Sequence, residues 1–368
     1  MKKLPYWLVL FCLIIASLRG TAQESKDTSA VKKAFIRKSS FIALPIVFYT
    51  PETRLGGGGA ALYTFRFASE SEESRPSQLQ FGLAYTQEKQ ILSYLPFDIY
   101  FKGEEWYISG EIGYYRYVYQ FFGLGNETLP ESESFEAAYP RFQLNVQKIV
   151  LPRLYLGVRY WMDDYRIIKR EEEGTLTQSI IEGQEGGFIS ALGLTANYDT
   201  RNHLFYPTKG QRIQLVSLFN RRALGARTNF DRYSLDASQY FPLGKAVLAI
   251  NGVAETMQGD VPFQQLALLG GPKRMRGFFE GRFRDKNLWV LQAEYRRVIK
   301  GIFGLAVFSG IGNVAPSFSG LFSQKVHLAY GLGLRIRLSK KDKINLRIDA
   351  GWNEEGALSP YLTVVEAF

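Results

Sequence analysis

The segment "HLAYGLGLRIRL" (residues 327–338) gives the clearest indication of the fold, because its side chains alternate between two kinds. One face carries Leu328, Tyr330, Leu332, Leu334 and Ile336, and the other carries Ala329, Gly331, Gly333, Arg335 and Arg337. Segments 344–351 ("INLRIDAG") and 154–163 ("LYLGVRYWMD") repeat the pattern. A period of two residues is typical of β-strands. A soluble β-sandwich would show the same alternation, so the pattern alone leaves two fold classes open.

The length of the alternating segments favours a membrane barrel. They run for about 10 to 16 residues, whereas soluble strands usually have roughly five or six and tilted membrane strands need roughly nine to eleven. Small and charged residues on one face suit a wet lumen, and large apolar residues on the other suit lipid. The 35 glycines and the aromatic content of 15% also favour one large closed sheet. We therefore predict an all-β fold, an antiparallel transmembrane β-barrel over residues 41–368.

Sixteen candidate strands can be placed along the chain. They are 41–50, 58–67, 77–86, 90–101, 105–117, 134–149, 151–168, 187–199, 210–220, 227–242, 245–257, 286–298, 303–314, 325–338, 343–352 and 359–368. An even number of strands leaves both ends of the barrel chain on the periplasmic side. The longer polar connections then lie on the outer side, and they are 118–133, 169–186, 258–285 and 315–324. The polar segment after residue 67 is an exception, because it becomes a long inner turn.

The N-terminal residues predict export. Two lysines precede an apolar run over residues 4–18, and small residues follow, which indicates a secretory signal peptide over residues 1–22. Residues 23–40 are expected to be a short periplasmic linker without a soluble domain. The single cysteine, Cys12, falls in the signal peptide, so the mature chain should lack disulfides and thiolate metal sites.

The formal net charge of +10 raises the question of nucleic-acid binding. Export argues against it, and the chain has no clustered basic helix and no aromatic stacking motif. We expect the cations instead to line a polar interior and to face anionic groups of outer-membrane lipid and lipopolysaccharide.

The sequence offers little for catalysis. Its two histidines, His203 in a turn and His327 at a strand end, are expected to be structural. No Ser/His/Asp arrangement, carboxylate pair or metal-ligand cluster stands out. We therefore expect no enzyme activity, no metal and no cofactor.

A turn motif, "YDTRNHLFYPTKG", occupies residues 198–210. Asp199 and Arg201 lie two residues apart, so they can share one face at a strand end. Pro207 presets a turn and Gly210 supplies a permissive backbone. By itself the motif predicts only a hairpin.

A second motif, "GGPKRMRGFFEGRFRD" (270–285), places five cationic side chains among glycines and phenylalanines. Together with the turn motif and with "LQAEYR" (291–296), "GLGLRIRL" (331–338) and "LRIDAG" (346–351), it resembles the BamA/TamA superfamily. Members of that superfamily, also called the bacterial surface antigen family, are outer-membrane assembly and translocation barrels. The resemblance covers essentially the whole predicted barrel.

The resemblance implies that the long outer loop folds inward and that its tip lies in the lumen. The tip residues are Arg276, Gly277 and Phe278. An unpaired arginine there would lose its hydration, so it needs an acidic partner. Gly310 stands where the family usually has that acid, which leaves Glu294 and Asp349 as candidates. The alternative is an exposed basic loop that binds lipopolysaccharide phosphate, a role that Lys273 and Arg274 could also have in a folded-in loop.

The function implied by the resemblance is insertion or export of outer-membrane proteins or lipids. The periplasmic POTRA repeats of the family have no counterpart in this sequence, so we expect a separate periplasmic partner protein. The alternative is a passive or plugged channel, or a structural surface protein, without insertase activity. An outer-membrane hydrolase is a third and weaker hypothesis.

The first and last strands are predicted to form a weak seam. Pro45 has no backbone N–H to offer a neighbouring strand, and the glycines of "PETRLGGGG" (51–59) loosen the first hairpin. Alternatively, Pro45 caps a short edge strand above the hydrocarbon. The terminal Phe368 suits recognition by the host barrel-assembly machinery, although Glu366 interrupts the outward apolar pattern.

Overall fold

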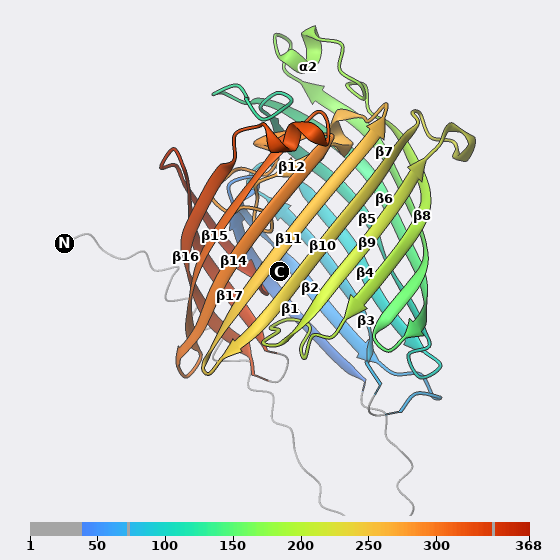
Figure 1. Cartoon of the computed structure of the whole chain (residues 1–368), viewed down its shortest axis with the longest axis vertical. Coiled ribbons are helices and arrows are strands. Elements are labelled where there is room, and N and C mark those ends of the chain that lie inside the picture. The colour runs from blue at the N-terminus through green and yellow to red at the C-terminus, as the bar shows by residue number, and fades with distance from the viewer. Residues whose placement is uncertain (1–38, 72–73, 341–342) are drawn as a thin grey trace, which may run out of the picture. The chain divides into compact units, whose positions relative to one another are not determined.

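The computed structural model describes residues 39–71, 74–340 and 343–368. Within the compact unit Ser39–Phe368, sixteen long strands close into one antiparallel barrel (Figure 1). The predicted fold class is therefore confirmed.

Some predictions lie outside the described residues. They concern the signal peptide (1–22) with Cys12 and nearly all of the linker (23–40). Within the part of the chain that the structure describes, no helix has the length and apolar character needed to cross a membrane.

The barrel strands follow one another around the wall in chain order. Their bounds are β1 Ser40–Thr50, β2 Arg54–Phe65, β3 Ser77–Thr86, β4 Ile91–Phe101, β5 Trp106–Phe121, β6 Glu133–Leu151, β7 Leu154–Arg170, β8 Gly187–Asp199, β9 Gly210–Asn220, β10 Phe230–Leu243, β11 Ala246–Gly259, β14 Asn287–Lys300, β15 Phe303–Ala315, β16 His327–Ser339, β17 Ile344–Asn353 and β18 Leu358–Val364. Most bounds agree with the predicted ones within a few residues. The main differences are at β2, β5 and β18.

Alternation along each strand separates the two faces of the wall. On β16, the side chains of Leu328, Tyr330 and Leu332 are exposed on the outer face, whereas Ala329 and Arg335 are buried. Exposed apolar side chains on long strands suit contact with lipid, and buried polar ones suit the interior of a membrane barrel.

One end of the barrel, called the loop end, carries the long connections, at the top of Figure 1. Its connections contain short elements that the sequence did not predict: α2 Thr175–Gln178, η1 Arg222–Leu224, η2 Phe263–Gln265, β12 Ala267–Leu269, β13 Phe283–Asp285 and η3 Ser319–Phe322. Segments this short give no readable periodicity. Their apolar side chains join those of the wall in a buried cluster that includes Phe121, Phe135, Phe263, Leu269, Phe278, Phe283 and Leu288. The opposite end, called the turn end, has mostly short connections.

The seam between β1 and β18 is the shortest stretch of pairing around the wall. Its register runs through a single pair of Cα partners, Tyr49 and Leu362. By contrast, β17 and β18 pair from Leu346–Val364 to Trp352–Leu358. Closure of the barrel at this seam therefore depends on few backbone hydrogen bonds, because each further register pair would add to the ladder.

Two details of the first hairpin differ from the predictions. Pro45 lies in the middle of β1, opposite Gly59 of β2, so it does not cap a short edge strand. The glycine run 56–59 lies inside β2 rather than in the turn. A Cβ at Gly56 would meet the ring of Phe48 at 2.3 Å, so glycine there makes room for an aromatic ring of the neighbouring strand.

The last strand was predicted to continue to residue 368, and this is wrong. β18 ends at Val364, and the chain turns at Val365, whose φ is 62°. Continued alternation would place the Glu366 carboxylate in the hydrocarbon, which is costly. Glu366 instead binds Arg335 at 2.8 Å, and Phe368 packs against a buried cluster of β10 and β11 side chains. Phe368 is therefore not part of an outward-facing terminal strand.

Candidate functional site

The loop between β11 and β14 reaches the inner wall at a tight turn around Gly277. This residue has a φ of 123°, and a Cβ there would lie 2.6 Å from the Trp352 carbonyl oxygen of β17. Only glycine combines this backbone conformation with so close an approach. The turn presents Arg276 to the inward side chains of the wall.

The guanidinium of Arg276 lies between the two acids that were candidates for its partner. Its Nη1 is 2.5 Å from Asp349 Oδ2, and its Nη2 pairs with Glu294. The three side chains are at most 1% exposed. The Phe308 ring of β15 stacks on the guanidinium, with its centroid 3.6 Å from Cζ. Arg276 thus pairs with both acids, and not with one of them.

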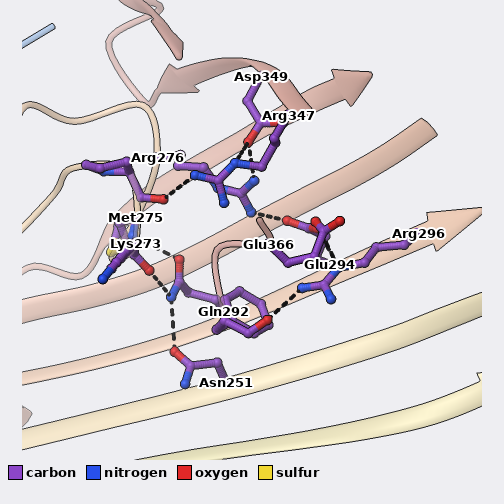
Figure 2. Close-up of polar contacts among 12 residues, drawn as sticks. Asn251, Lys273, Met275, Arg276, Gln292, Glu294, Arg296, Arg347, Asp349 and Glu366 are labelled. Atoms are coloured by element: carbon purple, nitrogen blue, oxygen red, sulfur yellow. Dashed lines mark hydrogen bonds and ion pairs between the residues drawn. The ribbon is translucent and has the colours of Figure 1, made fainter. Parts of the chain in front are cut away.

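Further charged residues extend this arrangement into what we call the lumen cluster (Figure 2). Its members are Arg276, Glu294, Arg296, Arg335, Arg347, Asp349 and Glu366. Arg335 of β16 binds three of the acids, at 2.9 Å from Glu294, 2.6 Å from Asp349 and 2.8 Å from Glu366. Arg296 lies 2.7 Å from Glu294, and Arg347 lies 3.1 Å from Asp349.

The lumen cluster therefore ties the loop tip, three wall strands and the C-terminal segment together. Buried charges of this kind cost desolvation energy that their mutual pairing must offset, so removing one member leaves its partners uncompensated. The sequence did not identify Arg296, Arg335, Arg347 or Glu366 as members. The only signal was that Arg335 and Arg347 lie on the small and charged faces of their strands.

The backbone of the loop tip is held by β18. The Gly277 N–H donates to the Tyr361 hydroxyl at 3.2 Å, and that hydroxyl donates to the Phe278 carbonyl at 3.2 Å. The Ser359 hydroxyl donates to the Gly277 carbonyl at 3.1 Å. The Phe278 ring is buried and contacts Phe283 edge-on. The loop tip thus contacts the strand that forms one side of the seam.

The family that the sequence resembles usually has an acid at the position of Gly310, whereas here the loop packs against this glycine. A Cβ added to Gly310 would lie 3.2 Å from Met275 Cγ and 3.2 Å from Gln292 Cγ. Gln292 also accepts a hydrogen bond from the Met275 N–H at 2.9 Å and donates to the Lys273 carbonyl at 3.1 Å. There is no space for a carboxylate at residue 310, because the loop packs directly on that part of β15.

The turn motif forms a separate site at the turn end. Arg201 and Asp199 form an ion pair at 2.9 Å, as their spacing allowed. Arg75, from the long turn between β2 and β3, donates to the Asp199 carbonyl at 3.1 Å. Pro207 is buried, and a Cβ on Gly210, whose φ is 94°, would lie 2.2 Å from the Thr200 carbonyl oxygen. The motif thus joins two turns that are far apart in sequence.

Comparison with known proteins identifies the family. The model of the Omp85 superfamily domain matches residues 74–352, which is most of the chain. The chain belongs to the Omp85 superfamily. A search of curated protein sequences gave no match.

Solved structures of Omp85-type barrels share the fold. BamA from Haemophilus ducreyi lacking POTRA domains 1-3 matches with a TM-score of 0.59 and 16% identity, over 89% of this chain and 70% of that one. CdiB from Acinetobacter baumannii matches with a TM-score of 0.55 and 11% identity, and CdiB from Escherichia coli with 0.58 and 9%. Each covers 89% of this chain, which spans 59% and 62% of the two CdiB chains. At these identities the likeness shows the fold alone.

An Omp85 barrel belongs to the bacterial outer membrane, and the predicted location is confirmed at this level. The even strand number puts both ends of the barrel chain at the turn end. In bacterial barrels the short turns face the periplasm and the longer loops face outward, which assigns the loop end to the outside. Of the two cations considered for lipopolysaccharide, Lys273 has an exposed side chain but lies beside the inward-folded loop tip, where its carbonyl accepts from Gln292 of the inner wall at 3.1 Å. Arg274 instead binds the buried Glu255 of β11 at 2.6 Å.

The two histidines are placed among aromatic and acidic neighbours. His327 stacks on Phe283, with ring centroids 3.8 Å apart, and its Nδ1 lies 3.1 Å from Glu354 Oε1. His203 Nδ1 accepts from the Phe205 N–H at 3.3 Å within the turn motif. Both contacts are of the structural kind that the sequence suggested.

Proposed function

We propose that this Omp85 barrel inserts or exports outer-membrane proteins or lipids by opening sideways at the β1–β18 seam. The observation that carries the proposal is the short pairing of β1 with β18, through Tyr49 and Leu362. In a closed barrel the backbone groups of every strand edge are normally hydrogen-bonded. Opening of the wall therefore costs the least free energy where the fewest backbone hydrogen bonds must break.

Two further features support an opening at this place. Pro45 removes one backbone donor from β1. The terminal residues after Val364 leave the seam and enter the lumen, where Glu366 is paired. The edge of β1 is thereby left longer than the strand that faces it, and an exposed edge is a template for pairing with another strand.

The proposal assigns no chemical reaction to the chain. It includes a separate periplasmic partner that would deliver clients to the turn end, contact with lipid and lipopolysaccharide around the wall, and assembly of this barrel by the host machinery.

The alternative function is a plugged channel or a structural surface protein. It is favoured by the apolar cluster at the loop end, where Phe121, Phe263 and Phe283 are buried among loop and wall side chains. Such a cluster obstructs a permanent aqueous path through the loop end. Single-channel conductance in planar bilayers would measure any remaining path.

A disulfide across the seam tests the proposal. Extending the Tyr49–Leu362 pair by two residues along each strand would bring Val47 opposite Val364, and both side chains are exposed on the outer face. Cysteines at these positions, with neighbouring registers also tried, would lock the seam, because the single native cysteine is Cys12. The matched control is a lock between β8 and β9 at Leu194 and Ser217, which are register partners.

The assay is folding of an unfolded outer-membrane barrel into proteoliposomes that contain this chain and a periplasmic extract. We expect the seam lock to abolish the insertion and reduction to restore it, whereas the control lock leaves it intact. Full activity with a verified seam lock would reject lateral opening and favour the plugged-scaffold function.

A further inference from the structure

A groove, called the outer groove, crosses the lipid-facing side of the wall from β7 to β14. Its volume is about 1190 Å³. Five steps between neighbouring strands, at about 4.8 Å each, give it a length of roughly 24 Å. One row of register partners lines it, in the order Leu156, Ala196, Leu215, Leu235, Ala254 and Trp289.

The side chains of this row all lie on the face that meets lipid. They have the same parity as Leu194, Tyr233 and Leu291, whose side chains are exposed. Among the described residues that line the outer groove, only Glu255 is charged. Its carboxylate is buried on the lumen side, where it binds Arg232 and Arg274. The outer groove is therefore mostly apolar, and no charged side chain lies in it.

The connection between β15 and β16 covers the loop-end part of the outer groove. Asn313 of β15 is the register partner of Trp289 and lies on the same outward face, yet its side chain is fully buried. Its Nδ2 donates to the Leu321 carbonyl at 2.9 Å and to the Gln324 carbonyl at 3.3 Å. The connection thus folds outward over the wall. Asn313 provides hydrogen bonds to backbone groups there, which lipid could not provide.

Two phenylalanines of this connection remain exposed. The side chains of Phe318 and Phe322 are 62% and 81% exposed, and their ring centroids are 5.7 Å apart in an edge-on contact. Both residues line the outer groove, so they lie beside the lipid-facing wall. Rings of this kind are costly in water, whereas aromatic side chains are favourable at the interface of a membrane barrel.

We propose that the β15–β16 connection is an anchor in the outer leaflet, and that the outer groove beneath it holds an acyl chain of a lipid. Phe318 and Phe322 insert among the lipid chains and cover one end of the groove. The apolar lining without a charged side chain fits hydrocarbon and gives a headgroup nothing to pair with. The inference goes beyond the proposed function and does not depend on it, because the groove lies on β7 to β14, away from the seam of β1 and β18.

Fluorescence quenching in lipid vesicles tests the anchor. The dye NBD is attached to the mature chain at Phe322→Cys, and at Ile180→Cys as the control. Ile180 is fully exposed in the β7–β8 connection and does not line the outer groove. We expect NBD at residue 322 to be quenched by doxyl-labelled phosphatidylcholine and to be several-fold less sensitive to aqueous iodide than NBD at residue 180. Equal sensitivity to iodide at the two positions would overturn the anchor.

Native mass spectrometry of the full mature chain in detergent tests the groove, with added phosphatidylethanolamine as the probe. Ala254→Trp places a ring inside the groove, and Ala293→Trp places the same ring on the exposed face of β14 outside it. We expect Ala254→Trp to retain several-fold less lipid than the wild type, and Ala293→Trp to retain as much. Phosphatidylglycerol should be retained like phosphatidylethanolamine, because the chain and not the headgroup is bound.

Three results would overturn binding of a chain in the groove. Equal retention by the two tryptophan variants would show that the groove is not the site. Clear preference for phosphatidylglycerol would show that a headgroup is recognised. A dimer mass that Ala254→Trp abolishes, with lipid retention unchanged, would assign the groove to a second copy of this chain. Heat-modifiable mobility checks folding, and Ser217→Phe, in the same groove, is used with the same criteria if Ala254→Trp does not fold.

Discussion

The Gly277 N–H of the loop tip donates to the hydroxyl of Tyr361 on β18 at 3.2 Å. The same hydroxyl donates to the Phe278 carbonyl, so one side chain holds two backbone groups of the loop against the seam strand. The loop tip is therefore hydrogen-bonded directly to one of the two seam strands. A change at the loop tip is expected to reach the seam through this contact, without passing through the rest of the wall.

Removal of this contact should loosen the seam. Tyr361→Phe deletes both hydrogen bonds and keeps the ring, and each such bond contributes about 1 kcal/mol. We expect a loss of about 2 kcal/mol in the free energy of unfolding, measured by urea titration of heat-modifiable mobility. Tyr330→Phe, on the outer face of β16, is the matched control. Equal effects of the two substitutions would show that the contact has no special role.

Arg276 should matter far more than its neighbour in the loop. Arg276→Ala removes one of the two cations that Glu294 and Asp349 share, and Arg335 remains bound to both. Breaking a buried ion pair costs up to about 3–5 kcal/mol. Lys273→Ala alters an exposed side chain, for which changes within about 0.5 kcal/mol are usual. Accumulation of folded barrel in the outer membrane compares the two variants. The inward position of the loop tip is wrong if both accumulate alike.

The mature chain should be recovered as a folded, heat-modifiable barrel in outer-membrane fractions. The reason is the outward apolar face of the long strands, which needs lipid. Fractionation followed by electrophoresis of heated and unheated samples is the measurement. Recovery as a soluble periplasmic protein would be incompatible with the membrane assignment.

The turn between β1 and β2 should respond to pH. Burial raises the pKa of Glu52 above its ordinary value of 4.5, although hydrogen bonds from Thr50 and from the Glu280 N–H oppose this. Because the folded pKa lies above the unfolded one, folding favours the protonated form. The contribution of Glu52 to stability therefore rises as pH falls through its folded pKa, and it levels off near 4.5.

Glu52→Gln supplies the comparison for this pH effect. The stability difference between Glu52→Gln and the wild type should be larger at pH 8 than at pH 5, since glutamine resembles the protonated acid. Glu127→Gln, which removes a carboxylate from an exposed loop, is the control substitution. A Glu52 difference that is the same at both pH values would show that its carboxylate titrates normally.

The wall of the barrel could be predicted from the sequence because it depends on local alternation. Strands such as β8 and β9 have the predicted bounds, since each residue's face follows from its position in the strand. The two acids near Arg276 were also predictable from their inward parity. Local patterns identify which side chains face the lumen.

The remainder of the site depends on contacts across the barrel that no local pattern shows. Arg335 binds acids from β14, β17 and the C-terminal segment, and these meet only because of strand tilt and closure. The departure of the chain from β18 follows from the pairing of Glu366, which the sequence could mark only as an interruption. The small elements of the loop end are likewise set by packing on Phe263 and its neighbours.

Opening of the seam itself is measured most directly by the distance between spin labels at residues 47 and 364, attached to cysteines in place of Val47 and Val364, in lipid vesicles. Labels at Leu194 and Ser217, partners across β8 and β9, provide the reference for a closed ladder. We predict a short distance with a second, longer population for the seam pair, and one narrow short distance for the reference pair. A single narrow distance for both pairs, with and without an unfolded client barrel present, would contradict lateral opening.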